Sequence, residues 1–137
     1  MYFKEIMSRH IKKLKKKAWS LLSKIRRLES ADKHGIVVCV TCGKKMKVAE
    51  AQAGHFIAGR TNAILFDERG IHVQCVGCNM FKGGNLIEYF YYMERKVGRK
   101  VIDELRRKSK KTVKITEDEY EEMIEAYKER LKCLEMR

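Results

Sequence analysis

Four cysteines that could bind a metal ion form two Cys-x-x-Cys pairs, Cys39 with Cys42 and Cys75 with Cys78. Two such pairs joined by a loop match the spacing of a structural tetrahedral zinc site, in which four thiolates bind one Zn²⁺. Paired cysteines in a reducing cytosol favour a metal over a disulfide. The pairs therefore predict structural zinc. A zinc knuckle that only holds the fold together, without catalysis, is the alternative for the same residues.

A histidine and an asparagine accompany these pairs and could carry catalytic chemistry. His55 lies between the pairs, after Gly54, and Asn79 directly follows Cys78. An imidazole can abstract a proton near neutral pH. The segment resembles the HNH, or ββα-metal, nuclease motif, in which a strand His activates water and a residue just after the second cysteine pair ligates the catalytic cation. The resemblance implies that His55 is the general base, that Asn79 binds the cation, and that Lys82 is the lysine this motif often has.

A longer string of residues narrows this resemblance. It comprises Ala53-Gly54-His55-Phe56, the run from Phe66 to Asn79, Gly84-Asn85 and Glu88-Tyr89. The string looks like the NinG family of lambdoid phages, the Rap recombination endonucleases, and the resemblance covers residues 39–98. It implies cleavage of branched recombination intermediates, such as Holliday junctions and D-loops, with Mg²⁺ or Mn²⁺. It also implies a phage-encoded protein that acts in the cytoplasm of the host cell.

Two positions depart from the HNH pattern. Most HNH sites have an Asp before the general-base His, and this Asp binds the cation, whereas this chain has Gly54. The candidates for the missing second ligand are Asp67, His72 and Asn85. The Asn that usually precedes the second cysteine pair is replaced by Gly70, which can keep a left-handed turn there without the amide. His72 follows two residues later and is a further catalytic candidate.

The formal net charge of +13 is concentrated in two segments that flank the cysteine region. Residues 1–30 carry a net +8 and residues 99–116 a net +6, whereas residues 117–137 carry −4. Phosphate is the expected partner of such segments, because each neutralised phosphate releases counterions. The residues predicted to bind DNA are Lys12, Lys13, Lys16, Arg60, Lys82, Arg106 and Arg107. A solvated lysine-rich surface, or a patch for anionic lipid, would have the same composition.

Hydrophobic periodicity predicts which elements position these residues. A stripe with steps of three and four over residues 7–28 predicts a long helix. Extended segments are expected at 36–38, 53–57, 64–66 and 71–74. Further helices are expected after the second cysteine pair, over 85–97 with Asn85 as cap, over 100–108, and from the capping box at Thr116 onward.

These elements predict an α+β fold. Its centre, residues 31–98, would be a zinc-stabilised ββα-metal (HNH/His-Me finger) core. A basic helix at 1–30 and basic, then acidic, helices at 99–137 would flank that core.

Four successive aromatic residues, Tyr89, Phe90, Tyr91 and Tyr92, lie in the helix expected over 85–97. Successive side chains point in different directions around a helix, so these rings cannot share one environment. The core is the commoner role for any one of them. One or two could instead stack on unpaired bases at a DNA junction.

Partners follow from the remaining patterns. No apolar run is long enough to span a bilayer and the first residues do not resemble a signal peptide, so we expect a cytosolic protein with no membrane partner. Apolar stripes at 7–28 and 120–134 lie in segments of opposite net charge and predict two helices that pair with each other. The helices could pair within one chain or across a homodimer. We favour the homodimer, because a junction presents two equivalent strands. The alternative functions are a general HNH nicking endonuclease on duplex DNA and a non-catalytic zinc-knuckle module that binds DNA or RNA.

Overall fold

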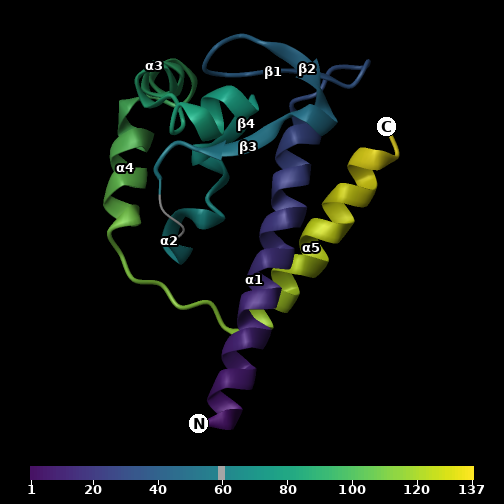
Figure 1. Cartoon of the computed structure of the whole chain (residues 1–137), viewed down its shortest axis with the longest axis vertical. Coiled ribbons are helices and arrows are strands. Elements are labelled where there is room, and N and C mark those ends of the chain that lie inside the picture. Colours follow the sequence, from purple (N-terminus) through teal and green to yellow (C-terminus); the bar gives the residue numbers. More distant parts are fainter. Residues whose placement is uncertain (59–60) are drawn as a thin grey trace. The chain divides into compact units, whose positions relative to one another are not determined.

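The computed structural model describes residues 1–58 and 61–137. Its contacts divide the chain into two compact units, one formed by Arg26–Val113 and one formed by Met1–Ile25 with Lys114–Arg137. Helices and small antiparallel sheets are both present (Figure 1), so the predicted α+β class is confirmed. None of the helices described is both long and apolar enough to cross a lipid bilayer.

Two antiparallel strand pairs carry the four paired cysteines. Strand β1 (Ile36–Val38) pairs with β2 (Lys45–Lys47), and the first cysteine pair lies in the turn between them. Strand β3 (Gln52–His55) pairs with β4 (Ile71–Gln74), and the second cysteine pair begins directly after β4. Because the backbone N–H of Val40 donates to the carbonyl oxygen of Val73 at 3.0 Å, the first cysteine turn is joined to β4. The backbone therefore brings the two cysteine pairs together.

Short turns and two helices complete this unit. Single 3-10 turns, Val48–Glu50 and Glu68–Gly70, precede β3 and β4, and a π-helical turn, Gly77–Phe81, follows β4. Helices α3 (Leu86–Lys96) and α4 (Arg99–Ser109) close the unit, separated by Gly98 with a φ of +88°. Their shared core is a buried cluster of Tyr89, Met93, Ile102 and Leu105.

Two local predictions are wrong. The strand expected at 64–66 is instead a helix, α2 (Asn62–Leu65). This helix packs against α4, and its Ile64 and Leu65 are buried. A short buried apolar run has no periodicity that distinguishes a strand from a helix, so only the packing decided this segment. Asn85 precedes α3 as expected but does not cap it: its φ is +49° and its side chain makes no cap hydrogen bond.

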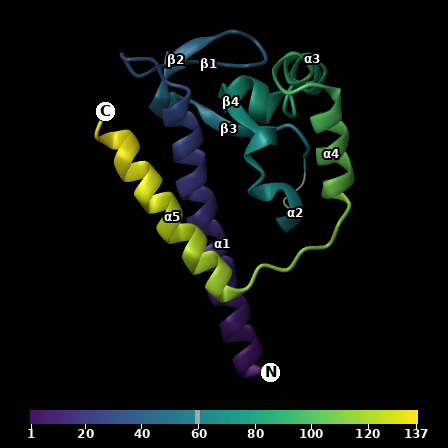
Figure 2. The same ribbon diagram turned by 180° about the vertical axis from the view of Figure 1, so that it is seen from behind.

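The second unit is a pair of helices, α1 (Tyr2–Glu29) and α5 (Glu117–Glu135). The part of α1 up to Ile25 belongs to this unit. Both views show the two helices side by side (Figures 1 and 2). The ion pairs His10–Glu117 at 2.8 Å and Lys24–Glu135 at 3.0 Å require that the helices run in the same direction. The Thr116 hydroxyl accepts the Glu119 N–H, which confirms the N-cap of α5. The two helices are thus joined by ion pairs within one chain, and the homodimer stays a prediction.

Candidate metal centre and active-site residues

The four cysteines predicted to bind zinc lie together. Their Sγ atoms are all within 4.8 Å of one another, and those of Cys42 and Cys75 are 3.7 Å apart. Four sulfur ligands at a Zn–S distance of about 2.3 Å lie about 3.8 Å from one another in a tetrahedron. The donor set and its spacing therefore fit a zinc ion, which the four cysteines could bind.

Hydrogen-bond donors surround these sulfur atoms. The N–H of Cys78 donates to Sγ of Cys75 at 3.3 Å, and Nδ2 of Asn85 donates to Sγ of Cys78 at 3.5 Å. The Thr41 hydroxyl lies 3.3 Å from Sγ of Cys39. Such donors stabilise the thiolate, which is the form that binds a metal. Asn85, a predicted cation ligand, is thus placed against a cysteine sulfur.

The thiols of Cys39 and Cys42 differ in pKa. Burial raises the pKa of Cys39, but hydrogen bonds from the Thr41 side chain and from backbone N–H groups lower it to about 6. A backbone hydrogen bond from Lys44 lowers the pKa of Cys42, yet burial and the neighbouring thiols raise it to about 12. Several thiolates so close together repel one another, so their joint ionisation needs a cation.

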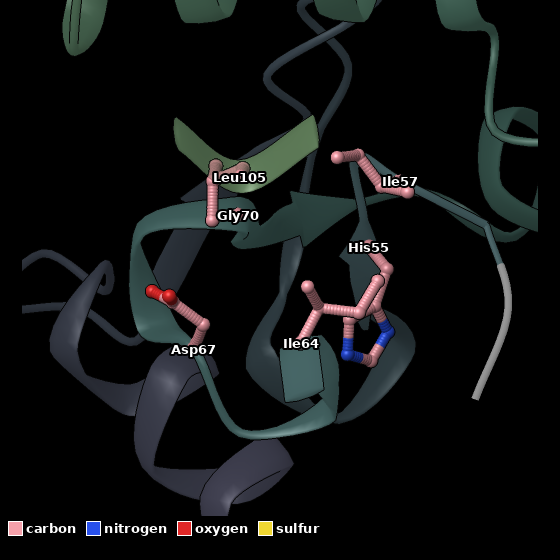
Figure 3. Close-up of a pocket in the computed structure, with 6 residues that line it drawn as sticks. All are labelled: His55, Ile57, Ile64, Asp67, Gly70 and Leu105. Atoms are coloured by element: carbon pink, nitrogen blue, oxygen red, sulfur yellow. The ribbon is translucent and has the colours of Figure 1, made fainter. Parts of the chain in front are cut away.

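His55 ends β3 and is half-buried in a small pocket (Figure 3). The free volume of the pocket is about 10 Å³, which is about the space of one water molecule. Nε2 of His55 lies 3.0 Å from the carbonyl oxygen of Leu65. A carbonyl oxygen can only accept, so Nε2 carries the hydrogen and the lone pair of the neutral ring lies on Nδ1. Nδ1 is therefore the atom that can take up a proton.

Asp67, a predicted cation ligand, lines the same pocket but is engaged elsewhere. Its Oδ2 lies 2.8 Å from Nη2 of Arg69 and 2.9 Å from Nζ of Lys108, while its Oδ1 accepts from N and Nε of Arg69. The Arg69 side chain, together with Lys108, holds the pKa of Asp67 well below its usual range. Figure 3 shows the carboxylate pointing away from the His55 ring. To ligate a cation, Asp67 would have to give up these partners.

Asn79 lies beside the residue that precedes His55. Its Nδ2 donates to Oε1 of Gln52 at 2.7 Å, and its Oδ1 would lie 3.0 Å from a Cβ added to Gly54. The same Cβ would overlap Oε1 of Gln74, whose side chain is fully buried. The space that a side chain at position 54 would need is thus filled by two amide groups.

Gln74 is a site residue that the sequence reasoning missed. Its Nε2 donates to Oγ1 of Thr41 at 3.1 Å and to the carbonyl oxygen of Gly84 at 2.8 Å. Its Oε1 has no hydrogen-bond partner among residues 1–58 and 61–137. Gln74 therefore ties the first cysteine turn to the segment after the second pair and faces Gly54. The available signal was a polar residue that ends a buried strand directly before a cysteine of the second pair.

A divalent cation fits this region in a limited way. Mg²⁺ and Mn²⁺ prefer oxygen ligands, and Mg²⁺ usually keeps several waters when it is bound by few protein groups. The amide oxygens of Asn79 and Gln74 are such ligands and lie next to Gly54. Only Asn79 is partly exposed. Asn79 is therefore the residue of the pair that can reach a cation that also contacts phosphate and water.

His72 is separated from the His55 pocket. In the β3–β4 pair, Gly54 is opposite His72 and His55 is opposite Ile71, so the two histidines lie on opposite faces of the hairpin. His72 is 8% exposed, and burial, with the positive charges of Arg26 and Lys96, lowers its pKa to about 4. Its ring is neutral at physiological pH and is not brought to the candidate base.

The basic residues predicted to bind DNA are solvent-exposed where the structure describes them. The exposed ones are Lys12, Lys13 and Lys16 on α1, Lys82 after the π-helical turn, and Arg106 and Arg107 on α4. Arg60 lies outside the described residues. Exposure leaves these side chains accessible to a polyanion and does not by itself identify one.

Known proteins resemble this chain over most of its length. Residues 4–136 match a family model described as "Bacteriophage Lambda NinG protein". Protein ninG of Salmonella phage P22 is 36% identical over 70% of this chain and 47% of its own length. Protein ninG of Escherichia phage 933W is 41% identical, and that of Escherichia phage lambda 39% identical, each over 49% of this chain and 33% of its own length. The chain thus spans between a third and a half of these relatives, and no solved structure matches it. The match over residues 4–136 shows that the chain belongs to the NinG family.

Proposed function

We propose that this chain is a metal-dependent DNA endonuclease that hydrolyses phosphodiesters at branched recombination intermediates, such as Holliday junctions and D-loops. The strand pair β3–β4 and the helical turn Gly77–Phe81 form the ββα-metal core in this proposal. The four cysteines bind structural zinc, which holds the hairpin and that turn in place without taking part in the chemistry.

One observation carries the proposal. Asn79, on the turn after β4, lies beside Gly54 on β3, and His55 is the next residue on that strand, with its side chain on the other face of the pleat. A candidate cation ligand and a candidate base thus come from neighbouring elements, because β3 pairs with β4 and the turn after β4 carries both Asn79 and Cys78 of the cysteine cluster.

Each residue of the site has its own role in the proposed reaction. The carbonyl of Leu65 orients the imidazole of His55, and Nδ1 accepts a proton from the attacking water. Asn79 would hold Mg²⁺ or Mn²⁺, which when bound neutralises charge on the scissile phosphate and on the leaving 3′ oxygen. Gln74 keeps position 54 free of a side chain and fixes the distance between strand and turn.

The charge distribution supports DNA as the substrate. The exposed basic side chains of α1 and α4 suit binding to phosphates without sequence readout. Affinity should then fall steeply with salt, and branch preference should arise from the geometry of the DNA. Two other functions predict different results: a nicking endonuclease would cut linear duplex equally well, and a non-catalytic zinc module would bind without cutting.

The experiment compares cleavage of a four-way junction, a fork and a linear duplex of equal length, with and without Mg²⁺. We expect Mg²⁺-dependent cleavage of the branched substrates. His55→Ala should lower the rate by at least about 100-fold, because general-base catalysis contributes about 10²–10⁴-fold, while DNA affinity stays nearly unchanged.

The matched control is His34→Ala, which removes another histidine from an exposed turn of the same unit. This variant should cleave at the wild-type rate. Wild-type cleavage by His55→Ala would reject the catalytic assignment, and equal cutting of junction and duplex would reject the recombination substrate.

A further inference from the structure

A second pocket lies in the unit formed by Arg26–Val113, away from the His55 pocket. We call it the Tyr92 pocket; its volume is about 250 Å³. The lining residues that matter here are Arg26, Val38, Val40, His72, Tyr92 and Lys96. Pockets that enclose a drug-sized molecule measure about 300–1,000 Å³. The Tyr92 pocket therefore suits one ring system and not an extended ligand.

The walls of the pocket combine apolar, aromatic and cationic groups. Val38 is 47% exposed and presents an apolar surface, and the ring of Tyr92 lies 5.1 Å from that of His72 in an edge-to-face arrangement. Arg26 donates through Nε to the carbonyl oxygen of Ile71 and through Nη1 to Glu29, which also lines the pocket. With Lys96 the net charge of the lining is positive, and the low pKa of His72 reflects this field as well as burial.

His72 offers the pocket a hydrogen-bond acceptor. Tyr89 donates its single hydroxyl hydrogen to the carbonyl oxygen of Gly54 at 2.7 Å, so towards Nδ1 of His72, at 3.2 Å, its oxygen accepts. Nδ1 of His72 therefore carries the ring hydrogen, and Nε2 has only a lone pair. In the described part of the chain Nε2 has no hydrogen-bond partner, and it is not among the fully buried unpartnered atoms. It therefore reaches the small open surface of His72, which lines the pocket.

We infer that the Tyr92 pocket binds a single unpaired nucleotide of a DNA strand, an inference that rests on the proposed action on branched DNA. The base packs against Tyr92 and the two valines, and an amino group of the base donates to Nε2 of His72. Arg26 and Lys96 contact the flanking phosphate. A paired base cannot enter such a pocket, so the site contributes recognition of branch points that basic surfaces alone do not provide.

The test measures binding and not cleavage. It uses the full-length, zinc-loaded His55→Ala variant without Mg²⁺, and duplexes of one length that carry an unpaired 2-aminopurine, an abasic site at the same place, or no unpaired position. Stacking on an aromatic side chain strengthens binding by about 5- to 150-fold per base. We expect a preference of this size for the 2-aminopurine duplex over the abasic duplex, with quenching of the base fluorescence.

Three substitutions test whether the pocket, and not helix α3 as a whole, provides the preference for the base. Tyr92→Leu should abolish both the preference and the quenching, whereas Tyr92→Phe, which keeps the ring, should retain them. Tyr91→Leu is the matched control, because Tyr91 is 52% exposed and does not line the pocket. Thermal unfolding and zinc content of each variant show that it is folded.

Several results would overturn the inference. Equal affinity for the base and the abasic site would do so, as would equal effects of Tyr92→Leu and Tyr91→Leu. Free dAMP binding as tightly as the unpaired duplex would assign the pocket to a small nucleotide. Absence of any DNA binding would reject this inference and the proposed function together. A base preference in a protein that never cleaves DNA would reject the endonuclease and leave the pocket intact.

Discussion

A methyl group at position 54 should disrupt the centre of the candidate site. The backbone at Gly54 does not lie in the left-handed region, so alanine meets no conformational barrier there, and only the lack of space opposes it. Its Cβ would overlap Oε1 of Gln74 and lie 2.8 Å from Cδ of the same side chain. Carbon atoms in van der Waals contact are about 3.5–4.0 Å apart. Gly54→Ala therefore forces Gln74 to move.

The cost follows from how Gln74 is held. It is fully buried, and its amide donates to Thr41 and to the carbonyl oxygen of Gly84. Overpacking a core costs about 1–3 kcal/mol, and leaving a buried polar group unpaired costs a further 1–3 kcal/mol or so. Gly54→Ala should lower the free energy of unfolding by about 2–6 kcal/mol, a large part of the 5–15 kcal/mol or so of an ordinary domain. Gly54→Asp, which restores the carboxylate of most HNH sites, should cost at least as much.

Denaturant unfolding of the zinc-loaded protein, followed by circular dichroism, measures this change. Gly77→Ala is the matched control, since its Cβ would meet only Sγ of Cys75 at an ordinary 3.7 Å. It should change stability by less than about 0.5 kcal/mol. In the double variant Gly54→Ala/Gln74→Ala the methyl group has room. The loss of unfolding free energy in the double variant should therefore be about 1–3 kcal/mol smaller than the sum of the losses in the two single variants. Wild-type stability of Gly54→Ala, or strictly additive losses, would refute the steric reasoning.

Three further predictions concern metal, pH and assembly. Cys39→Ser should abolish both zinc binding and cooperative unfolding, whereas Cys133→Ser, at an exposed cysteine outside the cluster, should leave both unchanged. Elemental analysis measures the zinc and circular dichroism follows the unfolding. A folded, zinc-free wild type would contradict the prediction. His72 has a folded pKa of about 4, below its unfolded value of about 6.5, so the unfolded chain binds more protons between these values and stability should fall by about 3 kcal/mol as the pH drops through that window. His72→Gln should lose this part of the acid sensitivity, and the same pH profile in both proteins would show that His72 does not titrate in this way. Light scattering tests the homodimer: a two-chain mass is expected, and a one-chain mass with and without junction DNA would show that α1 and α5 pair only within one chain.

Features that depend on short-range spacing could be predicted from the amino-acid sequence. The cysteine cluster was predictable because each Cys-x-x-Cys places two thiols on one turn, so only the approach of two such turns remained open. The long helix α1 was predictable from its apolar stripe, and the start of α5 from Thr116, because periodicity and capping act over three or four residues. The strand that carries His55 followed for the same reason.

Features that depend on contacts between distant segments could not be predicted in this way, because they arise from packing in the folded chain. The segment from Asn62 to Leu65 is a helix because its apolar residues pack against α4, more than thirty residues away in the chain. The Asn85 side chain turns to a cysteine sulfur instead of capping α3, because that sulfur offers a partner which local sequence does not reveal.

The surroundings of the predicted site residues also came from long-range packing. Asp67 and His72 have the residue types of a catalytic site, yet the first is held by Lys108 of α4 and the second is buried beside Tyr89 of α3. Gln74 fills the space beside Gly54 because the hairpin brings together two strands separated by a long loop. Residue types and spacing thus predict which side chains could do chemistry, whereas burial and hydrogen bonding, which decide which of them are accessible to a ligand, depend on contacts between segments far apart in the chain.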